Sequence, residues 1–573
     1  MSYGAFSEPF EEFPDIPPMI SASDGSALYD DGWRSLVGTI IAANDVTNLY
    51  RYAEVHGTCF FGPGAEVHEW NPDEWDPFLL AAEKGNIDVL RTLAEIFQSD
   101  LSQMEPLEAR FRRKNIHLLS VACLYARFET AEYLPSCGPP LGGKLNDQES
   151  TDPPLLYAVA ALGFTKERLG RDVEKSEIEN FVYRLLDRGA SVRQANRYAN
   201  EDQPDQQSSP KVLLKTVLGA AAPHASYRLA SRLIAEGADI HAQQEWYVLG
   251  EGDVKKVTAL HIASGSWNLE FIQALVENYS DGELAKAVTV ADSEGWLPLH
   301  WALFSLRNSF IQRSEEETIS KGLKIVELLL EANPDTVNTQ GQDGAAFNFA
   351  VAGMVDGAGR LLFVKLLLDT KPHANTLNAR DQSGDTALLH VLKHHEGCSW
   401  SHKGYFMPLI DLLLAHGADK SLYDNHGQTV LHKLASSPTH NEPVCPNLLE
   451  VLIPFVDINQ ADANSWTALH FMARNLRQLT ASRLPVSRGA NASAINKKGN
   501  TPLHEAVGGR LIRRGKKDGS LEWPTLSEKI QAQDEIISIL QEAGASMDQP
   551  NVAGKTSAEL LVDKRVQWEK GRE

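Results

Sequence analysis

Four residues that can bind a metal ion follow one another at intervals of four: His390, His394, Cys398 and His402. On a continuous helix this spacing would align them along one face, and imidazole nitrogen and thiolate sulfur are ligands that zinc favours. Gly397 lies inside the run and lowers its helix propensity. We therefore predict no metal cofactor, and we keep His394, Cys398 and His402 as candidate ligands only for the alternative that the chain is an enzyme.

A second set of histidines recurs inside short Thr-x-Leu-His stretches, in one of which leucine takes the place of threonine. A catalytic or metal role would require several of these side chains to meet at one point. One histidine per stretch, with the stretches spread along the chain, does not converge in this way, so we expect a structural role. The stretches are Thr258–His261, Leu297–His300, Thr429–His432, Thr467–His470 and Thr501–His504.

No other motif marks a catalytic centre. Gly554, Lys555 and Thr556 resemble the end of a phosphate-binding loop, but Gln549 stands where the first glycine of that loop belongs. The sequence contains no nucleophile elbow, no zinc-protease motif and no dinucleotide fingerprint. Aspartate and glutamate are scattered, as expected for a solvated surface. We predict no catalytic residues, no cofactor and no enzymatic activity.

The elements that position these side chains must fold from a long, acidic chain. It has 573 residues, more than the roughly 250–300 residues at which single cores stop growing, so several domains or a repeat array are expected. The formal charge of −22 at pH 7 argues against direct binding to nucleic acid or to an anionic membrane. Five cysteines without a Cys-x-x-Cys pair fit a reducing compartment, and the N-terminus lacks a signal-peptide pattern. We expect the cytoplasm, the nucleus or both.

Each histidine stretch belongs to a longer pattern. An Asp-x-x-Gly segment precedes it, as in Asp292–Gly295, Asp381–Gly384 and Asp424–Gly427. An apolar segment that ends in Gly-Ala follows it, as in 233–240 and 412–419. Glycine suits turns and helix ends that require a positive φ. The pattern therefore indicates pairs of short helices, which must stack on neighbouring copies because one pair cannot bury its apolar face alone.

This pattern resembles the ankyrin repeat, whose consensus D-x-x-G-x-T-P-L-H-x-A-A spans about 33 residues. The match is strong from about Thr258 to Thr556 and degenerate before that, and long insertions make the chain similar to ankyrin-repeat proteins of filamentous fungi. The resemblance implies a mostly α fold, an ankyrin-repeat solenoid of helix-turn-helix units with β-hairpin fingers. It also implies that each motif histidine ties its own loop to the next repeat by hydrogen bonds.

Four segments are predicted along the chain. Residues 1–29 are rich in acidic residues, proline and large apolar residues, and we expect them to form a disordered tail. Residues 30–145 hold degenerate N-terminal repeats and a cap, and residues 146–250 hold degenerate repeats with inserts. Residues 251–573 hold the well-marked repeats and a C-terminal cap.

Two tryptophans stand out at the predicted turns. Trp296 follows Gly295, and Trp466 occupies the same place after Ser465. Ankyrin proteins bind partners with the hairpin tips and the first helices, so an outward tryptophan there would be a typical interface hot spot. The alternative is that the tryptophan packs onto the neighbouring hairpin. The predicted partner-binding stripe comprises Trp296, Trp466, Ser293, Glu294, Asn425, His426 and Gln428.

Together these patterns favour a non-enzymatic scaffold, monomeric by itself, that binds a protein with a basic or mixed-charge patch. The acidic and aromatic segment 6–16 and the basic run 510–517 favour a regulatory adaptor, and in particular a transcription coregulator that binds a transcription factor. One alternative is a cytosolic scaffold or a ubiquitin-ligase substrate adaptor, although no F-box is visible. A further alternative is an enzyme whose site is built from the inserts.

Overall fold

The computed structural model describes residues 19–21, 27–29, 36–56, 76–99, 106–113, 117–137, 141, 153–199, 212–248, 252–304, 315–352, 357–373, 375–393, 403–436, 444, 446–511, 514–515 and 521–570. The candidate zinc ligands His394, Cys398 and His402 lie outside the described residues. Residues 1–18, the larger part of the predicted tail, lie outside them as well.

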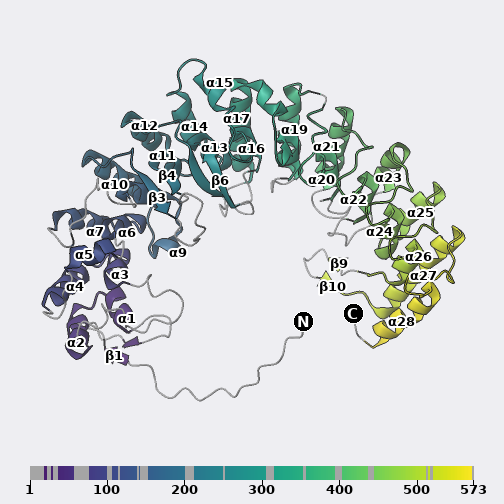
Figure 1. Cartoon of the computed structure of the whole chain (residues 1–573), viewed down its shortest axis with the longest axis horizontal. Coiled ribbons are helices and arrows are strands. Elements are labelled where there is room, and N and C mark those ends of the chain that lie inside the picture. Colours follow the sequence, from purple (N-terminus) through teal and green to yellow (C-terminus); the bar gives the residue numbers. More distant parts are fainter. Residues whose placement is uncertain are drawn as a thin grey trace, which may run out of the picture. The chain divides into compact units, whose positions relative to one another are not determined.

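Helices dominate the described part of the chain, which confirms the prediction of a mostly α protein (Figure 1). The strands described form five separate two-stranded sheets. The chain divides into two compact units, which are described separately below. Unit 1 comprises residues 1–246 with 273–278, and unit 2 comprises residues 247–272 with 279–573.

Unit 1 is built from helix–turn–helix pairs. The first helices of successive pairs contact one another in chain order. The first helices are α1 (Leu36–Ala42), α3 (Pro77–Lys84), α6 (Leu118–Leu124), α8 (Pro154–Ala160) and α11 (Val217–Ala221). Their second helices are α2 (Val46–His56), α4 (Ile87–Ser99), α7 (Phe128–Tyr133), α10 (Lys175–Asp187) and α12 (Tyr227–Ala235). The additional elements are α5 (Leu107–Arg113), η2 (Leu134–Ser136), η3 (Ala161–Gly163), α9 (Lys166–Leu169), β3 (Ala195–Ala199) and β4 (Val212–Thr216).

Unit 2 repeats the same arrangement, and its first helices again contact one another in chain order. They are α13 (Ala259–Gly265), α16 (Pro298–Phe304), α18 (Ala346–Ala352), α20 (Ala387–Lys393), α22 (Val430–Ser436), α24 (Ala468–Arg474), α26 (Pro502–Val507) and α28 (Ser557–Glu569). The second helices include α17 (Glu315–Ala332), α19 (Gly357–Asp369), α21 (Lys403–Ala415), α23 (Pro446–Leu452), α25 (Leu479–Ser487) and α27 (Leu526–Glu542).

The remaining elements connect these helices. They are α14 (Leu269–Val276), α15 (Glu283–Ala287), η5 (Pro334–Asn338), η6 (Ile453–Phe455) and the strands β5 (Gln244–Val248), β6 (Gly252–Val257), β7 (Gln340–Gly341), β8 (Gly344–Ala345), β9 (Arg514–Gly515) and β10 (Leu521–Glu522).

The motif residues explain where these helices begin and end. Thr467 and Thr501 are N-cap residues in extended conformation, and each forms a capping box with the histidine three positions later. Gly417 ends α21 with a φ of +93°, a conformation that an L side chain rarely adopts. Because the caps fix both ends of such short helices, the helices depend on packing against neighbours for the rest of their stability.

The end of the predicted disordered tail is ordered. Strand β1 (Met19–Ser21) pairs antiparallel with β2 (Ala27–Tyr29), and the side-chain amide of Asn48 donates a 2.8 Å hydrogen bond to the carbonyl of Ser21. The tail therefore does not extend to residue 29. The sequence contains a reason for this, because short apolar runs flank an Asp-Gly pair, which is a strong hairpin signal.

Candidate functional site

Four motif histidines of unit 2 join their own helical pair to the next one. In His432, Nδ1 accepts a hydrogen bond of 3.1 Å from the backbone N–H of Thr429, and Nε2 donates to the carbonyl of Trp466 at 3.0 Å. His470 makes the same bridge from Thr467 to the carbonyl of Asn500. The bridge requires the neutral ring with its proton on Nε2. His261 and His504 form equivalent bridges, so the predicted linking role is confirmed for these four histidines. His300 accepts a hydrogen bond of 3.0 Å from the N–H of Leu297 in its own segment.

Burial keeps these rings neutral. It lowers the pKa of His261 and of His300 to about 4 in each case, although nearby backbone carbonyls act in the opposite direction. Burial also lowers the pKa of His432, His470 and His504. The rings therefore remain uncharged near pH 7.

Other residues make the same bridge where the motif lacks its histidine. Asn348 accepts a hydrogen bond from the N–H of Ala345 at 3.2 Å and donates to the carbonyl of Asp385 at 3.1 Å. Its amide group thus supplies the acceptor and the donor that histidine supplies elsewhere. The sequence did not reveal this role, since Gly344–Phe347 is a weak copy of the motif.

A related substitution occurs in unit 1. Thr216 caps α11, and Gly219 stands at the place of the motif histidine. Gln244 fills the vacant space from the following segment, and its Oε1 accepts hydrogen bonds from the N–H and the hydroxyl of Thr216 at 2.9 and 2.8 Å. A β-carbon at Gly219 would lie only 2.1 Å from that oxygen. The small residue and the long amide are therefore complementary.

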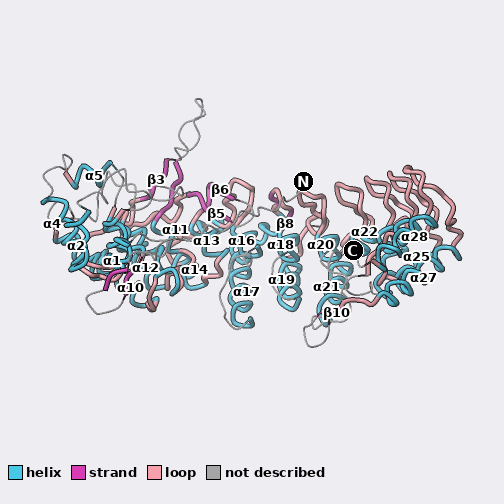
Figure 2. Tube along the Cα trace, turned by 90° about the horizontal axis from the view of Figure 1, so that it is seen from below, coloured by secondary structure: helices cyan, strands magenta, loops and turns pink. Residues whose placement is uncertain are grey.

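The turns that precede the first helices form a second kind of link. In several of these turns in unit 2 an Asp or Asn side chain accepts backbone N–H groups, as Asp292 does from Glu294 and Trp296, both at 2.9 Å. Neighbouring turns then bond through their backbones: the N–H of Ala463 donates to the carbonyl of His426 at 2.7 Å, and that of Lys497 donates to Asn464 at 3.1 Å. In Figure 2 these turns, drawn in pink, lie side by side along helices α22 to α28.

In three of these turns the Asp or Asn also pairs with the residue nine positions later, on the helix that follows. In two of them an aspartate accepts from a donor: Trp301 Nε1 lies 2.8 Å from Asp292, and Lys433 Nζ lies 2.7 Å from Asp424. In the third, an asparagine donates to an acceptor: Asn496 donates to Glu505 at 3.2 Å. In these three turns the donor and the acceptor are therefore matched.

Lys433 is the centre of a buried ionic cluster. Its Nζ lies 2.7 Å from Asp424 in its own segment and 2.7 Å from Asp385 in the preceding one, and all three side chains are buried. Burial lowers the pKa of Lys433, but the hydrogen bonds that it donates to Asp385 and Asp424 outweigh this and raise the pKa overall. The ammonium group is therefore charged and joins α22 to the segment before α20.

Asp381, Asp385 and His390 present ligand atoms within 4.8 Å of one another, a distance that would suit a metal ion. However, the ammonium groups of Lys433 and Lys393 already lie 2.7 and 3.4 Å from Asp385. Two positive charges beside that carboxylate disfavour a cation, so these residues do not fit a metal site.

Of the two alternatives for Trp296, the structure shows packing onto the neighbouring turn, so its proposed place in the partner-binding stripe is corrected. Its side chain is 1% exposed and packs between Phe304 and Phe349, with both ring centroids 5.2 Å away. Gly341 of the next turn makes room for the indole, because a β-carbon there would lie 2.8 Å from Trp296 Cδ1. Trp296 belongs to the core.

Trp466 and the other predicted contact residues lie along the turns. Trp466 is half-buried, stacks on Phe471 with centroids 4.8 Å apart, and lies 5.6 Å from the Arg474 guanidinium. The remaining residues fall in two separate turns and do not form one compact site. Ser293, Asn425 and His426 are exposed, whereas Glu294 and Gln428 are half-buried. Asn425 also bonds the carbonyl of Gln382 at 2.8 Å.

The turns carry exposed apolar side chains that the sequence analysis did not single out. Tyr423 and Ile495 each stand immediately before a turn Asp or Asn and are 48% and 55% exposed. Val552, inside the last turn, is 79% exposed. The motif itself contains no signal for these residues, because the positions they occupy hold many residue types.

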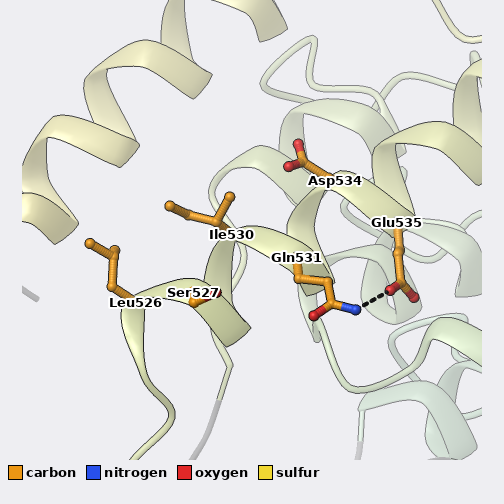
Figure 3. Close-up of a pocket in the computed structure, with 6 residues that line it drawn as sticks. All are labelled: Leu526, Ser527, Ile530, Gln531, Asp534 and Glu535. Atoms are coloured by element: carbon orange, nitrogen blue, oxygen red, sulfur yellow. Dashed lines mark hydrogen bonds between the residues drawn. The ribbon is translucent and has the colours of Figure 1, made fainter.

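A shallow depression of about 550 Å³ lies on α27 (Figure 3). Every residue that lines it belongs to this one helix, and Gln531 donates a 3.0 Å hydrogen bond to Glu535 within it. It lacks the convergent groups from several elements that an active site needs. The lining residues are Leu526, Ser527, Ile530, Gln531, Asp534 and Glu535.

Comparison with known proteins gives partial matches. Palmitoyltransferase AKR1 of Lachancea kluyveri is 30% identical over 164 residues, which is 29% of this chain and 19% of that protein. The E3 ubiquitin-protein ligase KEG of Arabidopsis thaliana is 26% identical over 187 residues, 32% of this chain and 10% of that protein. No family model matches the chain. The chain thus spans a fifth or less of the length of these relatives.

Both relatives contain ankyrin repeats, which gives weak support to the predicted resemblance. None of the helices in the described residues is long and apolar enough to cross a membrane.

Proposed function

We propose that this chain is an ankyrin-repeat protein whose turns and first helices in unit 2 bind a protein partner, and that it is not an enzyme. The observation that carries the proposal is the repeated bridge from a motif histidine to the carbonyl before the next cap, as from His432 to Trp466. With the backbone bonds between turns, these bridges connect most neighbouring segments of unit 2 along one edge. Such an edge can present side chains in a fixed order to a partner.

The exposed side chains on this edge suit protein binding. Tyr423, Ile495 and Val552 are apolar side chains surrounded by polar turn residues. Apolar anchors within a polar rim are the usual composition of a protein interface. Because the chain has a net charge of −22, we propose a partner with a basic or mixed-charge patch.

We further propose that the chain acts as a regulatory adaptor, with a transcription coregulator as the specific version. The acidic segment 6–16 and the basic run 510–517 support this version by their composition. A cytosolic scaffold or a ubiquitin-ligase substrate adaptor is the second candidate. The name of the Arabidopsis relative is compatible with it, but the match covers only 10% of that ligase.

The test is affinity capture from cells with the full chain, comparing the unchanged protein with Tyr423→Ala and Ile495→Ala. Both side chains are largely exposed, so the variants should keep their melting temperature while losing a specific partner. Val451→Ala on α23 is the matched control, because it removes an exposed valine away from the turns. Equal recovery of all partners by the three variants would contradict the proposed surface.

The same experiment separates the specific roles. Transcription factors among the specific partners would support the coregulator, and ligase or cytosolic components would support the second candidate. For the enzyme alternative, zinc analysis of the purified chain is the decisive measurement. Stoichiometric zinc would contradict the proposal that the chain has no metal cofactor and is not an enzyme. The candidate ligands would then be His394, Cys398 and His402.

A further inference from the structure

Unit 1 contains a group of three arginines far along the sequence from the proposed partner surface. Arg127 precedes α7, Arg168 lies on α9, and Arg171 follows α9. The whole chain has 54 basic residues against 76 acidic ones, so a group of basic residues that has no ion-pair partner among the described residues is unexpected.

Neutral groups hold Arg127 in place. Its Nε donates to the carbonyl of Glu83 at 2.6 Å, and its Nη2 donates to the carbonyl of Leu169 at 2.9 Å. These bonds orient the side chain without neutralising its charge.

The other two arginines are also fixed by neutral groups. Arg171 Nη2 donates to the carbonyl of Ala126 at 2.5 Å, and its guanidinium lies 5.0 Å from the ring centroid of Phe128. The guanidinium of Arg168 lies 3.8 Å from the centroid of Phe164. Stacking on a ring occupies the face of a guanidinium and leaves its N–H edge available.

Within the described residues, no carboxylate lies within ion-pair distance of Arg127, Arg168 or Arg171. Burial lowers the pKa of Arg127, and the positive charge of Arg171 lowers it further. Glu83 acts in the opposite direction, but its carboxylate is already paired with Lys84 at 2.6 Å. Within the described residues, the three guanidinium groups are therefore held in place by neutral groups without an ion-pair partner, and Arg127 and Arg171 lie close enough to repel each other.

We propose that Arg127, Arg168 and Arg171 form a binding site for a doubly charged oxyanion of the phosphate type. The guanidinium edge matches the oxygens of such an anion, and a dianion offsets more of the repulsion between Arg127 and Arg171 than a monoanion can. The ligand is either free phosphate or a phosphoryl group on a peptide. This proposal does not depend on the partner surface of unit 2.

The test is titration of the full chain with inorganic phosphate at pH 8, followed by the 31P line width. Sulfate, a dianion, should compete, whereas acetate at equal ionic strength should not. Arg168→Gln should weaken binding roughly tenfold, because one charge-assisted hydrogen bond is lost from an exposed side chain. Arg188→Gln is the matched control, since Arg188 has an acidic partner, Glu132, at 3.7 Å.

Phosphate broadening that Arg168→Gln reduces and Arg188→Gln leaves unchanged would support the site. No broadening, or an equal reduction in both variants, would overturn it. A phosphoserine peptide that binds more tightly than inorganic phosphate would identify a phosphoprotein as the source. Equal affinity for both would identify the free anion.

Discussion

Nε2 of His432 lies 3.0 Å from the carbonyl oxygen of Trp466, a residue that belongs to the next helical pair. The same ring accepts a hydrogen bond from the backbone of its own cap, at Thr429. One neutral side chain therefore closes a turn and joins two neighbouring segments.

Replacing this histidine should destabilise the chain. His432→Ala leaves the N–H of Thr429 and the carbonyl of Trp466 without this partner and opens a cavity. We therefore expect the free energy of local unfolding of this region to fall by about 2–4 kcal/mol. His432→Asn should recover part of the loss, because Asn348 makes the same bridge at its own position. Urea unfolding followed by hydrogen exchange measures both. His426→Ala, at an exposed site, is the control and should change nothing.

Stability should fall as the solution is acidified from pH 6.5. Histidine in the unfolded chain protonates near pH 6.5, whereas His261 and His300 have a pKa of about 4 in the fold. The unfolded state therefore binds more protons between these values, and the free energy of unfolding decreases as the pH falls. At pH 5 each of these two rings should cost on the order of 2 kcal/mol.

Melting temperatures measured between pH 7 and pH 5 test this effect. This pH range lies largely above the ordinary pKa values of carboxylates, so their protonation contributes little. A chain with His261→Asn and His300→Asn should show a shallower pH dependence than the unchanged protein. An unchanged slope would contradict the assignment of these rings as buried and neutral.

The buried cluster around Lys433 should be intolerant of losing its cation alone. Lys433→Met leaves Asp385 and Asp424 buried without their counter-charge, and we expect a loss of about 3–5 kcal/mol. Adding Asp385→Asn and Asp424→Asn should restore much of the stability, because the amides keep the acceptor oxygens without the charge. Thermal unfolding compares these variants. Lys365→Met, an exposed lysine on α19, is the control and should be neutral.

Two tryptophans at equivalent positions should behave differently. Trp296→Ala removes a fully buried ring between Phe304 and Phe349 and should cost about 3–5 kcal/mol. Trp466→Ala removes a half-buried ring and should cost clearly less. Melting temperatures of the two variants in the same buffer make the comparison. Equal losses would contradict the difference in burial.

The sequence predicted what depends on local spacing. The capping threonines, the turn glycines and the linking role of the histidines follow from types and intervals, and all three are present around Thr501 and His504, with Gly499 in the turn. The direction of Trp296 could not be predicted in this way, because it depends on the absence of a side chain at Gly341 in the following turn. The same holds for Lys433, whose second carboxylate belongs to the preceding segment.

Tyr423 and Ile495 of the proposed partner surface could not be predicted from the sequence for a different reason. Tyr423 and Ile495 are exposed because each stands just outside the turn, where the fold makes no demand on residue type. A repeat pattern specifies the residues that the fold requires. It does not predict the residue types at exposed positions that can contact a partner.

The joint between α20 and α22 differs in kind from its neighbours. Leu389 stands at the place of the linking histidine and has no polar atom to offer, while Lys433 crosses to Asp385 instead. Because each segment contacts only its neighbours, a stretched array can separate at one joint before the others. A pulling force, such as that of a protease that translocates the chain from one end, would have to break hydrogen bonds at most joints of unit 2. At this joint it would have to break the ion pair between Lys433 and Asp385. We therefore expect the order in which the segments open under force to depend on which side chain connects each pair.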